Sequence, residues 1–62
     1  MKKMEALHIA KMYMEEGYQS YEDDEYLIQE EMINDGYDFE DIDKVINLFR
    51  ELWDHAVYGG LY

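Results

Sequence analysis

Two glycine–tyrosine pairs constrain the fold of this chain more than any other feature of its sequence. The segment from residue 17 reads GYQSYEDDEYLI, the segment from residue 36 reads GYDFEDIDKVI, and the chain contains no proline. Glycine followed by an apolar residue is typical of a helix C-terminus, where the glycine adopts a left-handed conformation and the next side chain folds back on the last turn. The repeat therefore predicts that one helix ends before Gly17 and a second before Gly36.

This division predicts three helices, over residues 2–16, 21–35 and 39–58. Apolar residues recur every three or four positions in the third segment, which is the spacing of one helical face, whereas the periodicity of the second segment is weaker. No segment alternates with period two for long enough to predict a strand. We expect an all-α fold, a small three-helix bundle forming a single domain over residues 1–62. The predicted apolar faces are Met4, Leu7, Ile9, Ala10, Tyr13 and Met14, then Tyr26, Leu27, Ile28, Met32 and Ile33, then Ile42, Val45, Ile46, Phe49, Trp53 and Ala56.

Short polar residues predict how the second and third helices begin. Ser20, with Asp23 three residues later, predicts a capping box at the start of the second helix. Asp38 is the predicted N-cap of the third helix, with Asp41 at the third helical position. Tyr37, just before this cap, is expected to pack on Ile42 as a hydrophobic staple.

The size and composition of the chain exclude several classes of protein. Sixty-two residues form one domain, which buries only about 60 % of the surface of its unfolded chain. Without cysteine there is neither a disulfide framework nor a thiolate metal site. We see no signal-peptide pattern and no run of the roughly 20 apolar residues that span a bilayer. We therefore expect a cytoplasmic protein, located in the host cell if a phage encodes it.

The distribution of charge is the strongest indication of function. Sixteen Asp and Glu against five Lys and Arg give a net charge of −11, and the segment between Lys11 and Lys44 contains no base. The carboxylates of that segment are Glu15, Glu16, Glu22, Asp23, Asp24, Glu25, Glu30, Glu31, Asp35, Asp38, Glu40, Asp41 and Asp43. Capping and solvation can explain each of them singly. Eight of them have no Lys or Arg at i+4 that would stabilise the helices, which favours a role in binding; these are Glu15, Glu16, Glu22, Asp23, Asp24, Glu25, Glu30 and Glu31.

A folded surface dense in carboxylates resembles the phosphate backbone of DNA, which carries one charge per roughly 1.7 Å of duplex. In charge and size the chain is similar to the DNA-mimic inhibitors of bacteriophages, such as anti-CRISPR and anti-restriction proteins. We expect it to bind and inhibit a basic nucleic-acid-binding protein (a nuclease, polymerase, or repair or defence factor), without binding nucleic acid or membrane itself. The predicted contact residues are Glu22, Asp23, Asp24, Glu25, Glu30, Glu31, Asp35, Asp38, Glu40 and Asp41, with Tyr21 and Tyr26 adding aromatic contact area.

A second interpretation remains open at this point. The chain could be a non-catalytic adaptor or regulatory protein that binds a partner through the apolar face of the third helix, with the acids serving solubility. Leu48 and Leu52 would then be candidates for a homodimer contact.

Enzyme activity, a cofactor and a metal site are not expected. The acidic stretch after Asp35 does not match the ligand spacing of a calcium-binding EF-hand. His8 and His55 are the only histidines, and no nucleophile or His-x-x-x-His pair accompanies them. We therefore assign no catalytic residues.

Overall fold

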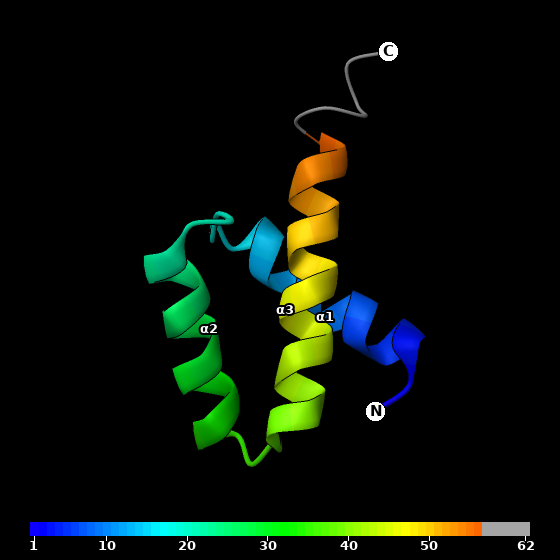
Figure 1. The fold of residues 1–62 in the computed structure, drawn as a ribbon, viewed down its shortest axis with the longest axis vertical. Coiled ribbons are helices and arrows are strands. Elements are labelled where there is room, and N and C mark those ends of the chain that lie inside the picture. Colours follow the sequence, from blue (N-terminus) through cyan, green and yellow to red (C-terminus); the bar gives the residue numbers. More distant parts are fainter. Residues whose placement is uncertain (57–62) are drawn as a thin grey trace.

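The computed structural model describes residues 1–56 and places three helices in them: α1 (Lys3–Glu15), α2 (Glu22–Asn34) and α3 (Phe39–Asp54). Helix α3 lies at the centre of the molecule, α1 crosses behind it, and α2 runs beside it in the opposite direction (Figure 1). The predicted all-α three-helix fold is confirmed. The predicted end of the third helix near residue 58 lies outside the described residues. No helix within residues 1–56 has the length and apolar character needed to cross a bilayer.

Both glycine–tyrosine pairs end a helix as predicted. Gly17 and Gly36 have φ angles of 104° and 93°, in the left-handed region that glycine adopts without strain. In each turn the amide of the tyrosine bonds to a carbonyl five residues back, and the amide of the glycine bonds to a carbonyl three residues back. The bonds run from Tyr18 to Tyr13 (3.2 Å), Gly17 to Met14 (3.2 Å), Tyr37 to Met32 (3.1 Å) and Gly36 to Ile33 (3.1 Å).

The N-terminus of α3 is also as predicted. Asp38 is the N-cap, and its Oδ1 accepts a hydrogen bond from the backbone amide of Asp41 at 2.9 Å. Tyr37, immediately before the cap, is half-buried and packs against the core. The α2–α3 connection is therefore determined at both ends by local hydrogen bonds, which explains why it is only a few residues long.

The capping box predicted at Ser20 is wrong. Helix α2 begins after Tyr21, and no side chain caps its first amides. The hydroxyl of Ser20 instead donates to Glu25 Oε2 at 3.4 Å, while Asp24 Oδ2 accepts a hydrogen bond from the amide of Gln19 at 2.8 Å. Carboxylates in the first turn of α2 thus reach back to hold the loop, and the serine acts as a donor rather than as the cap.

The core is assembled around one side of α3. Phe49 and Val45 are fully buried, and α1 packs against them through the small residues Ala6 and Ala10, which let the two helices approach closely. Helix α2 makes the smaller contact with α3 and contributes only two buried side chains. The complete core is Ala6, Ile9, Ala10, Tyr13, Ile28, Met32, Ile42, Val45, Ile46 and Phe49.

Several residues predicted to face the core are exposed instead. Met4 is 84 % exposed because the buried side of α1 is centred on Ala6 and Ala10, and Met4 points away from both other helices. In α2 the apolar residues are spread around the helix, and only Ile28 and Met32 meet α3. The predicted core positions that are exposed are Met4, Tyr26, Leu27, Ile33 and Ala56, and those that are half-buried are Leu7, Met14 and Trp53.

The positive φ of Gly36 provides a test of the helix-ending mechanism. Replacing Gly36 with L-alanine should lower the free energy of unfolding by about 1–2 kcal/mol, because a Cβ disfavours this backbone conformation. For so small a domain, each kcal/mol corresponds to roughly 4–8 °C in Tm. D-Alanine, introduced by chemical synthesis, is the matched control. An L-configured Cβ at Gly36 would meet no atom within 4 Å, so the expected loss comes from the backbone conformation and not from a steric clash. D-Alanine prefers positive φ, so it should preserve or raise Tm. Equal losses for both enantiomers in a thermal melt would contradict this mechanism.

Candidate functional site

The residues predicted to contact a partner lie on α2, on the turn after it and on the first turn of α3. Four of the acids form the first turn of α2, where the positive end of the helix dipole favours them. Asp35 is the C-cap of α2, and Asp38 is the N-cap of α3. The structure therefore places the predicted residues in one continuous region of the chain around α2. The acids in the two first turns are Glu22, Asp23, Asp24, Glu25, Glu40 and Asp41.

One of these acids is engaged inside the molecule by the only arginine. Arg50 of α3 donates from Nε and a terminal nitrogen to the two carboxylate oxygens of Glu25, at 2.8 Å each. The side chain of Glu25 is largely covered, and hydrogen bonding to Arg50 holds the pKa of this carboxyl below its usual range. The pair joins α2 to α3, so Glu25 stabilises the fold rather than offering a free charge.

Three more of the predicted contact acids also have partners within the chain. Asp41 lies 3.0 Å from the amino group of Met1, Asp38 caps α3, and Asp24 holds the loop before α2. The remaining six are exposed and form no ion pair with any residue in 1–56. We call these six the unpaired acids: Glu22, Asp23, Glu30, Glu31, Asp35 and Glu40.

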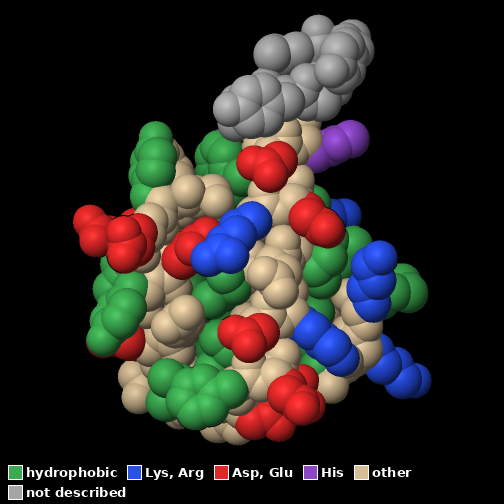
Figure 2. Space-filling model, in the orientation of Figure 1, with side chains coloured by type: hydrophobic (Ala, Val, Ile, Leu, Met, Phe, Trp, Pro, Cys, Tyr) green, Lys and Arg blue, Asp and Glu red, His purple; other side chains and the backbone are tan. Residues whose placement is uncertain are grey.

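The basic residues lie mostly away from the unpaired acids. Lys2, Lys3 and Lys11 belong to the N-terminal helix and its approach, and Lys44 donates to the carbonyl of Met1 at 2.9 Å. In Figure 2 the Lys and Arg side chains gather mainly over the N-terminal half of α1 and the adjoining part of α3. The charge of the molecule is therefore asymmetric, and no lysine neutralises the outer side of α2 by an ion pair within the described residues.

Two tyrosines are exposed among these acids. Tyr21 is 67 % exposed and Tyr26 is 62 % exposed, whereas Tyr18 and Tyr37 are half-buried against the core. Leu27 and Ile33 are exposed on the same helix as Tyr26. The outer side of α2 thus combines carboxylates with aromatic and aliphatic side chains, a composition that suits a protein contact better than simple solvation.

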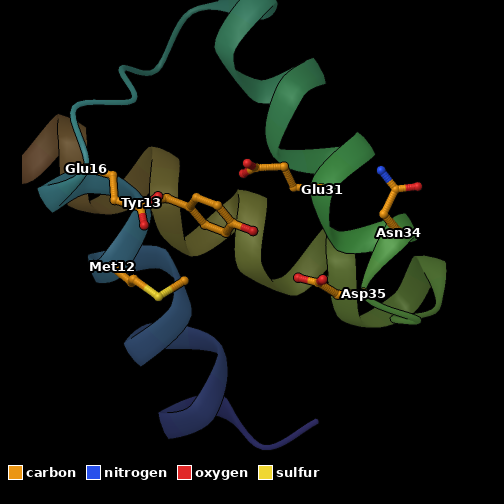
Figure 3. Close-up of a pocket in the computed structure, with 6 residues that line it drawn as sticks. All are labelled: Met12, Tyr13, Glu16, Glu31, Asn34 and Asp35. Carbon is orange, nitrogen blue, oxygen red and sulfur yellow. The ribbon is translucent and has the colours of Figure 1, made fainter.

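A pocket of about 280 Å³ lies between the last turns of α1 and α2. Tyr13 projects from α1 toward Glu31 and Asp35 of α2, and Glu16 and Asn34 complete the polar lining together with the side chain of Met12 (Figure 3). Burial, and then the negative charges of Glu31 and Asp35, raise the pKa of Tyr13 to about 12. Its hydroxyl is therefore protonated at neutral pH.

Sequence reasoning identified only part of this pocket. Glu31 and Asp35 belong to the predicted contact set, but Tyr13 was expected only as a core residue and Asn34 had no predicted role. Partial burial and the charge of Glu31 also raise the pKa of Tyr18, which lines a neighbouring hollow with Glu16 and Asp24. No spacing within one helix could reveal the pocket, because it forms only when α1 and α2 meet.

The apolar face of α3, proposed as the alternative binding site, is used by the core. Ile42, Val45 and Phe49 are covered by the other two helices. Leu48 and Leu52, the candidates for a homodimer contact, are half-buried against the same core. Most of the larger exposed apolar side chains of the described residues lie on α1 and α2; the others are Tyr21, just before α2, and Phe39, the first residue of α3.

Comparison of the chain with models of protein families, with curated proteins and with solved structures finds no match. Function is therefore inferred from the exposures, charges and contacts described above. Within residues 1–56, no three histidine or carboxylate side chains come together in a way that could hold a metal ion.

The Glu25–Arg50 pair can be tested through the pH dependence of stability. Arg50→Gln should lower the free energy of unfolding at pH 7 by about 1 kcal/mol, because it leaves the largely covered carboxylate of Glu25 unpaired. The loss is no larger because the exposed guanidinium group of Arg50 is screened by solvent. Pairing lowers the pKa of Glu25. Its contribution is therefore present above the ordinary value of 4.5 and is lost as pH falls through the lower pKa of the folded state.

Urea unfolding followed by the fluorescence of Trp53, the only tryptophan, measures this difference at pH 7 and pH 3. Lys11→Gln removes the same charge from an exposed residue without an ion pair in the described chain and is the matched control. A deficit for Arg50→Gln that persists unchanged at pH 3, or an equal deficit for Lys11→Gln, would refute the assignment.

Proposed function

We propose that this protein binds a basic nucleic-acid-binding protein through the unpaired acids and thereby blocks its access to nucleic acid. The observation that carries the proposal is that six exposed carboxylates surround α2 and the start of α3 without a cation of their own. Within the described residues the only ion pair between side chains joins Arg50 to Glu25, so it involves none of these six acids. Lysine and arginine side chains of a partner would supply the missing counter-charges.

The density of charge along α2 supports mimicry of a nucleic acid strand. Residues 22–35 extend over roughly 21 Å of helix axis at the usual rise per residue. With Glu25 neutralised, six charged acids remain in this stretch, or one charge per roughly 3.5 Å; they are Glu22, Asp23, Asp24, Glu30, Glu31 and Asp35. A single DNA strand carries one charge per roughly 3.4 Å. A groove whose basic residues match a phosphate backbone could therefore accept α2 at a similar spacing.

The exposed tyrosines support a protein partner rather than a simple counter-ion atmosphere. Tyr21 and Tyr26 lie beside acids of the first two turns of α2 and present large amphipathic side chains to solvent. Tyrosine is enriched among residues that dominate the energy of protein interfaces. Contacts of this kind would add affinity that persists when salt weakens the ion pairs.

The proposed function depends on specific acids, which a matched pair of triple variants can test. Glu22→Gln, Asp23→Asn and Glu30→Gln together remove three charges from unpaired acids of α2. The control combines Glu5→Gln, Glu51→Gln and Asp54→Asn, three exposed acids on the other two helices. Both triples change the net charge equally. We expect the α2 triple to weaken partner binding at least tenfold and the control triple to leave it nearly unchanged, with the same far-ultraviolet circular dichroism in both.

The measurement is capture of partners from a bacterial lysate by the immobilised protein, with mass-spectrometric identification. Support requires that the captured protein binds nucleic acid, that duplex DNA displaces it, and that the α2 triple loses it. A partner that resists DNA, or that binds both triples equally well, would contradict the proposal and favour an adaptor function.

The salt dependence of the same complex is a separate prediction. Exposed charges are screened over about 10 Å at 0.1 M salt and over about 3 Å at 1 M salt. Affinity should therefore fall steeply when sodium chloride rises from 50 to 300 mM, as surface plasmon resonance or calorimetry would measure, and the slope should be shallower for the α2 triple. Affinity that is indifferent to salt would indicate apolar docking instead.

A further inference from the structure

A groove with a mainly apolar surface lies between α1 and α3. Its volume is about 280 Å³, and its lining residues are Lys3 of α1 and Lys44, Asn47 and Leu48 of α3. Leu48 is half-buried, so the groove exposes the part of this side chain that the core leaves uncovered. Sites for small molecules usually begin at about 300 Å³. The size of the groove therefore favours a side chain of another protein molecule as its occupant.

Lysines surround this groove. Lys3, Leu7 and Lys11 recur every four residues and therefore lie along one side of α1. Neither Lys3 nor Lys11 forms an ion pair within the described residues. Lys44 donates one of its N–H groups to the carbonyl of Met1 at 2.9 Å, which leaves two further donors. The occupant that fits these features has an apolar side chain between carboxylates.

The acids of α3 leave these lysines available. Among the described residues, no carboxylate lines the groove. Glu40 lies one turn before Lys44, and Glu51 lies one turn after Asn47. Neither acid forms an ion pair with a lysine in the part of the chain that the structure describes. The charge next to the groove can therefore be met by another molecule.

The chain itself carries the matching surface on α2. Asp23, Tyr26, Leu27 and Glu30 are three or four positions apart, so they share one side of this helix, and all four are exposed. An aromatic and an aliphatic side chain thus lie between two of the unpaired acids. We call these four residues the outer face of α2.

The spacing of the charges also matches. Asp23 and Glu30 are seven residues apart, or roughly 10.5 Å along the axis of α2. Lys3 and Lys11 are eight residues apart, or roughly 12 Å along the axis of α1. Two acid–lysine pairs can therefore form at the same time, with Leu27 between them.

We propose that the outer face of α2 of one copy docks on the groove between α1 and α3 of a second copy. The apolar side chains of α2 then cover Leu48, and Asp23 and Glu30 meet the lysines around the groove. The two copies contribute different surfaces, so each pair retains a free groove and a free α2, and assembly continues into rings or chains. A docked α2 is not open to a basic partner, so self-assembly competes with the proposed function without resting on it.

The net charge of the molecule determines the conditions under which this assembly forms. A charge of −11 on each copy opposes their approach at low ionic strength. Exposed charges are screened beyond about 10 Å at 0.1 M salt, whereas partly buried pairs are screened much less. Association should therefore be stronger at about 150 mM sodium chloride than at about 10 mM.

The test is sedimentation equilibrium of the purified full chain at about 150 mM sodium chloride. We expect the average mass to rise above that of the monomer as the protein concentration approaches about 1 mM. A mass that stays monomeric over this whole range would overturn the inference.

Charge reversal identifies the two surfaces. Lys3→Glu with Lys11→Glu reverses the groove, and Asp23→Lys with Glu30→Lys reverses the outer face of α2. Each double variant should associate at least tenfold more weakly than the unaltered chain, because like charges then face each other. Combining all four substitutions restores opposite charges at the unaltered net charge and should restore association. Circular dichroism checks that each variant keeps its helices.

The α2 reversal separates docking from general repulsion. It makes the molecule less negative, so reduced repulsion alone would strengthen association, whereas loss of the docked contact weakens it. Association that persists in the α2 reversal, or that the fourfold reversal does not restore, would contradict the inference. Leu27→Ser removes an exposed apolar side chain without changing the charge and should weaken association at least threefold. An unchanged affinity for this variant would likewise count against docking through α2.

The outcome for self-assembly is distinguishable from the outcome for the proposed function. If the purified chain associates and the reversals behave as expected while no DNA-displaceable partner is captured, self-assembly stands and nucleic-acid mimicry fails. If such a partner is captured by a chain that remains monomeric at about 1 mM, mimicry stands and self-assembly fails.

Discussion

Burial of one side of α3 is the constraint on which the rest of this small structure depends. Phe49, Val45 and Ile42 are the shared surface against which both other helices pack. Burying a large apolar side chain contributes roughly 1.5–3 kcal/mol, and a chain of this size has few such residues with which to offset its loss of conformational entropy. A net charge of −11 opposes compaction further. The apolar side of α3 is therefore taken up by the core and is not open to a partner.

The two outer helices are held to α3 by different means, and this difference affects function. Helix α1 approaches α3 closely through Ala6 and Ala10, whereas α2 relies on Ile28, Met32 and the pairing of Glu25 with Arg50. The arginine neutralises Glu25 of α2, and no ion pair within the described residues compensates the unpaired acids of that helix. The helix with the lighter packing is thus also the helix with the most unpaired charge. Such an arrangement costs stability, which is why we attribute the charge to binding.

The candidate site was predictable in position but not in detail. The absence of Lys and Arg between residues 11 and 44 identifies the acidic region from composition alone, and the structure places that region around α2 and its two ends. Which acids are free could not be predicted, because Glu25 and Asp41 find their partners on distant parts of the chain. Tyr13 could be predicted as a core residue. The negative charges near its hydroxyl could not, because they belong to residues at the end of α2 that are about 20 positions away in the sequence.

The sequence by itself determined where the first two helices end and how the third begins, because those features depend on hydrogen bonds and φ angles within five or six residues. Gly17, Gly36 and Asp38 act through such local chemistry. Tertiary structure decided which side of α1 and α2 is buried, since both helices have apolar residues on more than one side and only packing against α3 selects between them. It also decided that Ser20 donates to Glu25 instead of capping α2, and that Tyr13 meets the carboxylates of α2. These outcomes depend on contacts between helices, which no pattern within a single helix contains.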